Sequence, residues 1–182
     1  MRMVGGQVQK FDVIVVGAGP GGAMTALELA AKGFQVLLLD KQHFPRYKVC
    51  GGAVSAKAQE LLDFPLEELS LNSVCRAHLG VYRGISAEVE LETPFIYMVM
   101  RDKFDQRLVQ SAINKGVEFR TGEDFRTLER KAEGVVVHTG KGAYLAGFVV
   151  GADGVYSGVR QQLNLGWKPR WGFALEGEYS VK

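Results

Sequence analysis

Cysteine and histidine are scarce in this chain of 182 residues, which has two of the first and three of the second. Cys50 and Cys75 provide neither a disulfide framework nor metal-ligand spacing, and each histidine stands alone. We therefore expect a reducing, cytoplasmic setting and no metal site. Charge is nearly balanced, with 22 basic and 20 acidic residues, so no nucleic-acid partner is expected. Charged residues interrupt the apolar stretches, and we predict neither a signal peptide nor a transmembrane span.

The stretch from Phe11 to Lys41 has the pattern of a strand, a glycine-rich turn, a helix and a second strand. The apolar run 13–16 is typical of a strand buried on both faces of a parallel sheet. Gly17, Gly19 and Gly22 follow with G-x-G-x-x-G spacing, which permits a tight turn, close approach of a pyrophosphate and close helix packing. The N–H groups that begin the helix suit an anionic pyrophosphate.

Two further features complete a dinucleotide-binding unit. Gly33 is placed to end the helix, and residues 35–39 predict a strand with Asp40 at its end. Asp40 stands 23 positions after Gly17, close to the offset of a carboxylate that accepts hydrogen bonds from a ribose. Because strand, glycines, helix and acid agree, we predict a dinucleotide site rather than a glycine-rich turn without a ligand.

The segment 41–53, KQHFPRYKVCGGA, predicts a loop because it is rich in proline, glycine and basic residues. Its glycine pair permits positive φ or close backbone approach. Arg46 and Lys48 can meet a phosphate or carboxylate of a cofactor, although a solvated connection explains them equally well. The same two cations would lower the pKa of the nearby thiol of Cys50.

Regular elements are expected through the middle of the chain. Residues 101–115 predict a helix with Asp102 as N-cap, a buried stripe of apolar side chains and a stop at Gly116. A cation at a helix start opposes the helix dipole, so Arg101 should have a specific partner. The other predicted elements are a short helix (55–62), a hairpin (77–82 and 87–91), a strand (96–100), a parallel strand (117–120) and an antiparallel meander (125–128, 134–138, 143–145).

The segment FVVGADGVYSGVR, residues 148–160, predicts a buried strand over 148–150, a glycine-bracketed acid and a helix with Ser157 near its start. Asp153, between Gly151 and Gly154, can hydrogen-bond the cofactor loop or the cofactor. A purely structural turn is the alternative, since Asp and Gly are common turn residues.

The first unit together with PRYKVCGG (45–52) resembles the geranylgeranyl reductase family of FAD-dependent oxidoreductases, part of a larger group built like the aromatic hydroxylases. GADGVYSGVR resembles the G-A-D-G-x-x-S-x-x-R segment of that group. The resemblance implies an α/β fold: a Rossmann-like FAD-binding domain with a parallel sheet and a small antiparallel meander, plus the beginning of a second, substrate domain. It also implies that Arg101 reaches the cofactor, that the backbone near Phe125 borders the adenine, and that Cys50 lies near the flavin ring.

Cys50 is the one catalytic candidate, as a proton donor, a gate or a packing residue. The full set of predicted cofactor-binding residues comprises Gly17, Gly19, Gly21, Gly22, Asp40, Lys41, Arg46, Cys50, Gly51, Gly52, Ala53, Arg101, Phe125, Asp153 and Gly154.

We expect residues 1–73 and 101–168 to form the FAD-binding domain and 74–100 to be strands of the substrate domain. Residues 169–182 would begin a further substrate-domain strand, over 171–180. Members of the resembling family continue well beyond this point, so we expect a truncated protein, a proteolytic fragment or a partial gene product. Apolar faces left uncovered would favour self-association.

The resemblance implies an FAD-dependent reductase of isoprenoid, geranylgeranyl-type carbon–carbon double bonds, with hydride passing from flavin N5 to the alkene. The partners would be an isoprenoid lipid or pigment and an electron donor, either NAD(P)H or a ferredoxin-like protein, with peripheral contact at the inner face of a membrane. Alternatives are a flavin monooxygenase or halogenase, a quinone-linked electron-transfer flavoprotein, and an FAD-binding fragment without turnover. An NAD-dependent dehydrogenase would have no use for PRYKVCGG or GADGVYSGVR.

Overall fold

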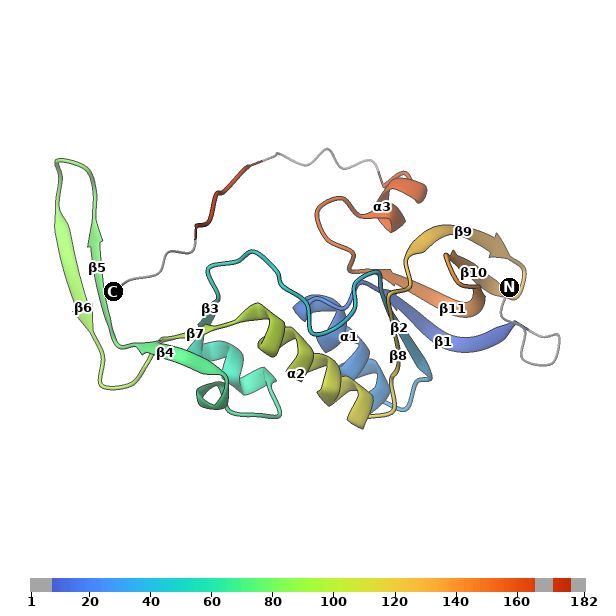
Figure 1. Cartoon of the computed structure of the whole chain (residues 1–182), viewed down its shortest axis with the longest axis horizontal. Coiled ribbons are helices and arrows are strands. Elements are labelled where there is room, and N and C mark those ends of the chain that lie inside the picture. Colours follow the sequence, from blue (N-terminus) through green and yellow to red (C-terminus); the bar gives the residue numbers. More distant parts are fainter. Residues whose placement is uncertain (1–7, 166–171, 178–182) are drawn as a thin grey trace. The chain divides into compact units, whose positions relative to one another are not determined.

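The computed structural model describes residues 8–165 and 172–177 (Figure 1). The chain divides into two compact units. The first comprises Met1–Arg46 and Asp105–Gly172, and the second comprises Tyr47–Phe104 and Phe173–Lys182. We describe each unit by itself.

The first unit is built on a six-stranded sheet of order β8-β2-β1-β11-β10-β9. Four strands run parallel, with β1 central between β2 and β11, and β10 and β9 continue the sheet as an antiparallel meander. The α/β fold, the parallel sheet and the meander predicted from the sequence are confirmed. The strands are β1 (Gln9–Val16), β2 (Val36–Asp40), β8 (Glu118–Thr121), β9 (Phe125–Lys131), β10 (Gly134–Thr139) and β11 (Ala143–Gly151).

The described residues of the first unit also contain α1 (Pro20–Ala31), α3 (Gly158–Gln162) and the part of α2 (Arg101–Asn114) that follows Phe104. Gly33 and Gly116 follow α1 and α2 in the left-handed region, with φ of +87° and +95°, as expected of helix stops. The predicted N-cap of α2 is wrong. The helix already begins at Arg101, so Asp102 lies inside the first turn, where its Oδ1 accepts the Lys103 N–H at 2.8 Å.

The core of the first unit gathers on the central strands, where Ile14, Leu37 and Leu39 are fully buried together with Tyr144 from β11. The prediction of a separate buried strand over 148–150 is wrong in two respects. Residues 143–151 form one continuous strand, and Phe148 is 72% exposed. The physical reason is that β10 pairs only with 143–146, which leaves the later part of β11 with β1 as its one strand partner.

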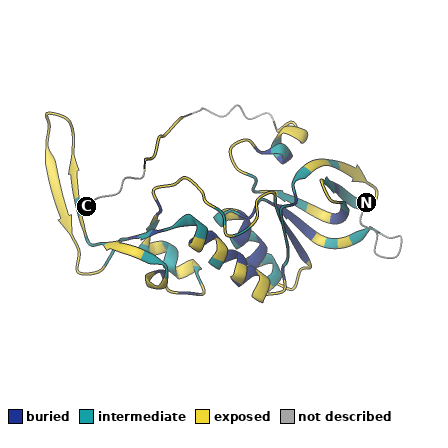
Figure 2. Ribbon diagram, in the orientation of Figure 1, coloured by how far each residue is buried: buried dark blue, intermediate teal, exposed yellow. Residues whose placement is uncertain are grey.

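The second unit has two small antiparallel sheets. One has the order β3-β7-β4, and the other is the hairpin β5–β6, which is exposed along its length (Figure 2). Phe64, Leu66 and Phe104 are buried in this unit, and the two phenylalanine rings meet edge to face. The elements are β3 (Ala53–Ser55), 3₁₀ helices over Ala56–Leu61 and Leu66–Glu68, β4 (Ser70–Val74), β5 (Arg76–Gly80), β6 (Ser86–Glu90) and β7 (Ile96–Val99).

The predicted hairpin and the strand over 96–100 are confirmed, and the short helix predicted over 55–62 is a 3₁₀ helix. The strand predicted over 171–180 is not formed in its described part, because residues 172–177 have no regular structure. Its other residues, 171 and 178–180, lie outside the described residues.

Candidate cofactor site

The glycine turn between β1 and α1 has the sterics that the sequence predicts. Gly17 has φ of +100°, and a Cβ added there would lie 2.4 Å from the carbonyl oxygen of Ala152. A Cβ on Gly22 would lie 1.8 Å from the Gly17 oxygen, so the helix approaches the turn too closely for any side chain. Gly21, by contrast, faces open space. The first and last glycines of the motif are therefore required by the fold itself.

We call the turn over residues 17–22 the glycine cradle. Gly19 forms its open floor, the part of the turn that no side chain covers. It is the N-cap of α1 and has no side chain, and the first turn that follows holds Pro20 and no acidic residue. A Cβ on Gly19 would have one neighbour within 4 Å, the Nη2 of Arg46 at 3.9 Å. Unpaired N–H groups at a helix start attract anions, so the turn presents positive potential to free space.

Asp40 has a bonding role that spacing alone does not show. Its Oδ2 accepts the Ala18 N–H and its Oδ1 accepts the Gln42 N–H, both at 2.8 Å. The carboxylate thus holds the glycine turn against the end of β2. Each oxygen can accept a further hydrogen bond, so a contact with ribose hydroxyls remains compatible with this geometry.

Arg46 ends the first unit's N-terminal part in a largely buried position. Its Nη2 lies 2.9 Å from Oδ2 of Asp105, and its side chain is only 12% exposed. The guanidinium carbon sits 4.8 Å from the centroid of the Phe44 ring. Nη1 is buried, and among the described residues it has no hydrogen-bond partner. Buried N–H donors are nearly always paired in folded proteins, so a ligand that supplies an acceptor to Nη1 would fit this position.

Asp153 caps the helix α3. Its Oδ2 accepts the N–H groups of Gly158 and Val159 at 2.7 and 3.2 Å, while Oδ1 is buried and has no partner among the described residues. Gly154 adopts φ of +84°. Phe125 packs on the core of the sheet, and its ring lies against Gly158, where an added Cβ would come within 3.2 Å. Asp153 therefore has the structural role in a turn that the sequence offered as an alternative. One of its carboxylate oxygens, Oδ1, has no hydrogen-bond partner among the described residues.

These features fit an anionic dinucleotide. The cradle combines an open glycine floor, an uncapped helix N-terminus and the neighbouring Arg46 guanidinium, which is a donor set suited to phosphate oxygens. Gly17, Gly19, Gly22, Asp40 and Arg46 are the residues that would hold the group. The assignment of Asp153, Gly154 and Phe125 to the same ligand stays a prediction.

The second unit brings Cys50 and Arg101 together. The Gly52 backbone hydrogen bond and then the hydrogen bond from the Arg101 side chain hold the pKa of the Cys50 thiol below its usual value. Gly52 itself is sterically required, since it has φ of +74° and an added Cβ would lie 2.2 Å from the Val99 oxygen. The thiol is therefore one partner of Arg101, and the residue's predicted contact with the cofactor stays untested.

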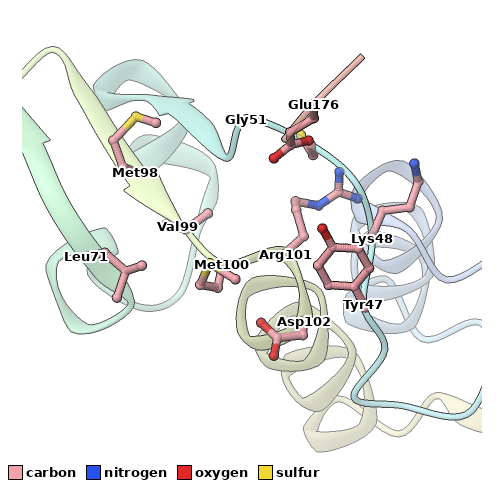
Figure 3. Close-up of a pocket in the computed structure, with 11 residues that line it drawn as sticks. Tyr47, Lys48, Gly51, Leu71, Met98, Val99, Met100, Arg101, Asp102 and Glu176 are labelled. Atoms are coloured by element: carbon pink, nitrogen blue, oxygen red, sulfur yellow. The ribbon is translucent and has the colours of Figure 1, made fainter. Parts of the chain in front are cut away.

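The thiol lines a pocket of about 270 Å³ within this unit. Figure 3 shows an apolar side formed by β7 and Leu71 and a polar side that carries Lys48 and Arg101. The lining residues are Tyr47, Lys48, Cys50, Gly51, Leu71, Met98, Val99, Met100, Arg101, Asp102 and Glu176.

Sequence reasoning missed several of these residues. Asp105 carries a signal: it shares the stripe of α2 with Leu108 and Ala112, and a charge at a buried position requires a partner. Met98 and Met100 had no signal beyond an apolar strand. Lys41 is exposed, and Ala53 lies in β3 opposite Met98, so neither has a contact that defines a role.

Within residues 8–165 and 172–177, no three histidine, cysteine or acidic side chains gather closely enough to hold a metal ion. No helix in that same part of the chain is both long and apolar enough to cross a membrane.

Comparison with known proteins extends these observations. Residues 10–174 match the family model of the FAD binding domain. An uncharacterized protein of Methanosarcina barkeri is 31% identical over 173 residues, covering 93% of this chain and 44% of the relative. Geranylgeranyl diphosphate reductase of Rhodobacter capsulatus is 33% identical over 159 residues, covering 85% of this chain and 40% of the relative. Other relatives are named as monooxygenases and halogenases.

The fold is shared with solved structures. A geranylgeranyl bacteriochlorophyll reductase-like protein from Thermoplasma acidophilum superposes with a TM-score of 0.70 at 23% identity, covering 79% of this chain and 39% of that one. The chain spans about two fifths of the length of the M. barkeri and R. capsulatus relatives. The glycine cradle, its fit to a dinucleotide and the match over residues 10–174 lead to one conclusion: the chain belongs to the FAD-binding domain family, and FAD is its cofactor.

Proposed function

We propose that the protein in which this domain acts is an FAD-dependent reductase of isoprenoid carbon–carbon double bonds. The observation that carries the proposal is the pocket of the second unit, which the Cys50 thiol, with its lowered pKa, lines together with the apolar residues Leu71, Met98 and Val99. The similarity to the R. capsulatus reductase supports the same choice.

Saturation of an alkene adds one hydride and one proton across the double bond. FAD, when bound and reduced, supplies the hydride. The residues of this chain bind the hydrocarbon and provide the proton. Leu71, Met98 and Val99 give the apolar contact that an isoprenoid chain requires, because methionine and aliphatic side chains adapt to flexible hydrocarbons.

Cys50 is suited to deliver the proton. Donation leaves a thiolate, and the Gly52 and Arg101 hydrogen bonds that lower the thiol pKa stabilise that product. The thiol is exposed, so it can recover a proton from water after each turnover. A general acid of this kind works best when its pKa lies near the operating pH.

The remaining parts of the proposal concern partners. The substrate is an isoprenoid lipid or pigment, and access to it requires peripheral contact with a membrane surface. The electron donor is NAD(P)H or a ferredoxin-like protein, since one dinucleotide fingerprint is present and FAD takes it.

The proposal is tested under anaerobic conditions with the protein, added FAD, dithionite as a donor-independent reductant, and geranylgeranyl diphosphate. Mass spectrometry should show two hydrogen atoms gained for each double bond reduced. Hydroxylation or halogenation that requires oxygen, without saturation, would favour the monooxygenase or halogenase alternatives. Bound FAD with no change in substrate mass would mean that this chain binds the cofactor without turnover.

A matched pair of variants tests the thiol. Cys50→Ala should lower turnover about 100-fold, the loss typical of a missing general acid, whereas Cys75→Ala should leave it unchanged. Normal turnover in Cys50→Ala would exclude a chemical role for Cys50.

A further inference from the structure

Asp105 is an unusual residue for a helix stripe, because its side chain is fully buried and charged. It lies on α2 on the same face as Leu108 and Ala112, which are also buried. Burial of an ionised carboxylate is costly unless a cation and hydrogen bonds compensate it. The Arg46 guanidinium, 2.9 Å away, supplies that compensation.

In this ion pair one terminal nitrogen of Arg46 contacts Asp105, and the other has no partner among the described residues. Nη2 contacts Asp105, and the Phe44 ring packs on the guanidinium plane. Because the guanidinium is a rigid fork, fixing one nitrogen and the plane also fixes the direction of Nη1. Nη1 is buried and has no hydrogen-bond partner among the described residues.

The same guanidinium borders the cradle of the first unit. Nη2 lies 3.9 Å from a Cβ built on Gly19, the N-cap of α1. No side chain caps that helix, and no acidic residue occupies its first turn. A phosphate group is the part of a dinucleotide that a helix N-terminus receives.

We propose that Asp105 is a positioning residue for cofactor binding: it orients the Arg46 guanidinium, whose Nη2 lies 3.9 Å from a Cβ built on Gly19, so that the guanidinium donates to a phosphate oxygen of FAD at the N-terminus of α1. This inference rests on the FAD-binding domain and is independent of the reductase activity proposed above.

The direction in which ADP affinity changes on neutralising Asp105 distinguishes two possible roles for this residue. A carboxylate near a pyrophosphate repels it, so an Asp105 that acted only through its charge would weaken binding, and its neutralisation would tighten binding. A positioning role predicts the reverse, because Asp105→Asn would release the guanidinium that Asp105 holds beside Gly19.

The experiment measures ADP and adenosine affinities of the FAD-free protein by calorimetry, together with the apo melting temperature. Asp105→Asn should weaken ADP binding about tenfold, the loss of one charge-assisted hydrogen bond, and leave adenosine binding unchanged. Asp102→Asn, the same change one turn earlier on α2, is the control and should alter neither affinity.

Tighter or unchanged ADP binding in Asp105→Asn would overturn the proposal, and so would an equal loss for ADP and adenosine, which would indicate a merely structural role. If Asp105→Asn does not fold, Arg46→Lys tests the same point, since lysine keeps the charge but lacks the fork. It should lose ADP affinity about tenfold while retaining adenosine affinity.

Discussion

The sheet of the first unit and the hairpin of the second are built from similar residues but differ in how they are covered. On β1 and β2, Ile14, Val15 and Leu38 have no exposed surface. On β5–β6, Leu79 is 61% exposed and Ile85 is 86% exposed. Apolar composition alone therefore does not decide burial. The layers packed against a strand do.

The hairpin register explains its pattern. Ala77 opposes Val89 and Leu79 opposes Ala87 on one face, while the neighbouring pairs, Arg76 with Glu90 and His78 with Glu88, occupy the other. The first face is apolar, and Arg76 bridges both glutamates on the second. A two-stranded hairpin is marginal in water by itself, so this ribbon gains little stability from the described residues, whereas the six-stranded sheet carries its own core.

The largest difference in the free energy of unfolding should appear between alanine substitutions of two leucines. Leu38→Ala, in the fully buried centre of β2, should lower the free energy of unfolding by about 2 to 5 kcal/mol. Leu79→Ala should change it by less than about 0.5 kcal/mol because the side chain is exposed. Urea denaturation followed by circular dichroism measures both. Equal losses would show that the hairpin face is covered in solution.

A smaller contrast lies within the glycine turn. Gly22→Ala places a Cβ against the Gly17 carbonyl oxygen and should cost about 1 to 3 kcal/mol. Gly21→Ala meets open space on the same helix and should stabilise the apo protein by about 0.5 to 1 kcal/mol. Thermal unfolding without FAD separates the two effects, and a loss in Gly21→Ala would contradict the open position.

The apolar face of the hairpin should drive weak self-association. Replacing Val81 and Ile85, which face each other near the turn, by serine should lower the association constant measured by sedimentation equilibrium. His78→Ser, on the opposite face, is the control. A dimer that persists unchanged in the double variant would show that association uses another surface.

The smallest expected effect is on the pH at which the Cys50 thiol becomes reactive. Since its thiol pKa is lowered, the alkylation rate by iodoacetamide should rise with pH at a midpoint below that of a free thiol. Arg101→Gln removes the hydrogen bond and the positive charge that favour the thiolate, so the midpoint should move upward. Measurement in a Cys75→Ser background isolates the signal. An unmoved midpoint would leave the Gly52 backbone as the sole cause of the lowered pKa.

Much of the first unit could be predicted from the sequence because its signals are local. The spacing of Gly17 and Gly22, the helix stops at Gly33 and Gly116, and the buried stripe of α2 depend on steric rules within a few residues, and the structure confirms them. The position of Asp40 at the end of β2 belongs to the same class, although its bond to Ala18 N–H does not.

The amino-acid sequence by itself determined the βαβ unit and the glycine cradle, because backbone sterics and hydrophobic period act over short distances. The family was indicated by the resemblance of two motifs, PRYKVCGG and GADGVYSGVR, to those of known flavoproteins. Only the tertiary structure decided that Arg46 pairs with Asp105, that Cys50 receives a hydrogen bond from Arg101, and that Phe148 stays exposed. Those outcomes depend on which distant segments pack together and which strand lacks a neighbour, and no local pattern carries that information.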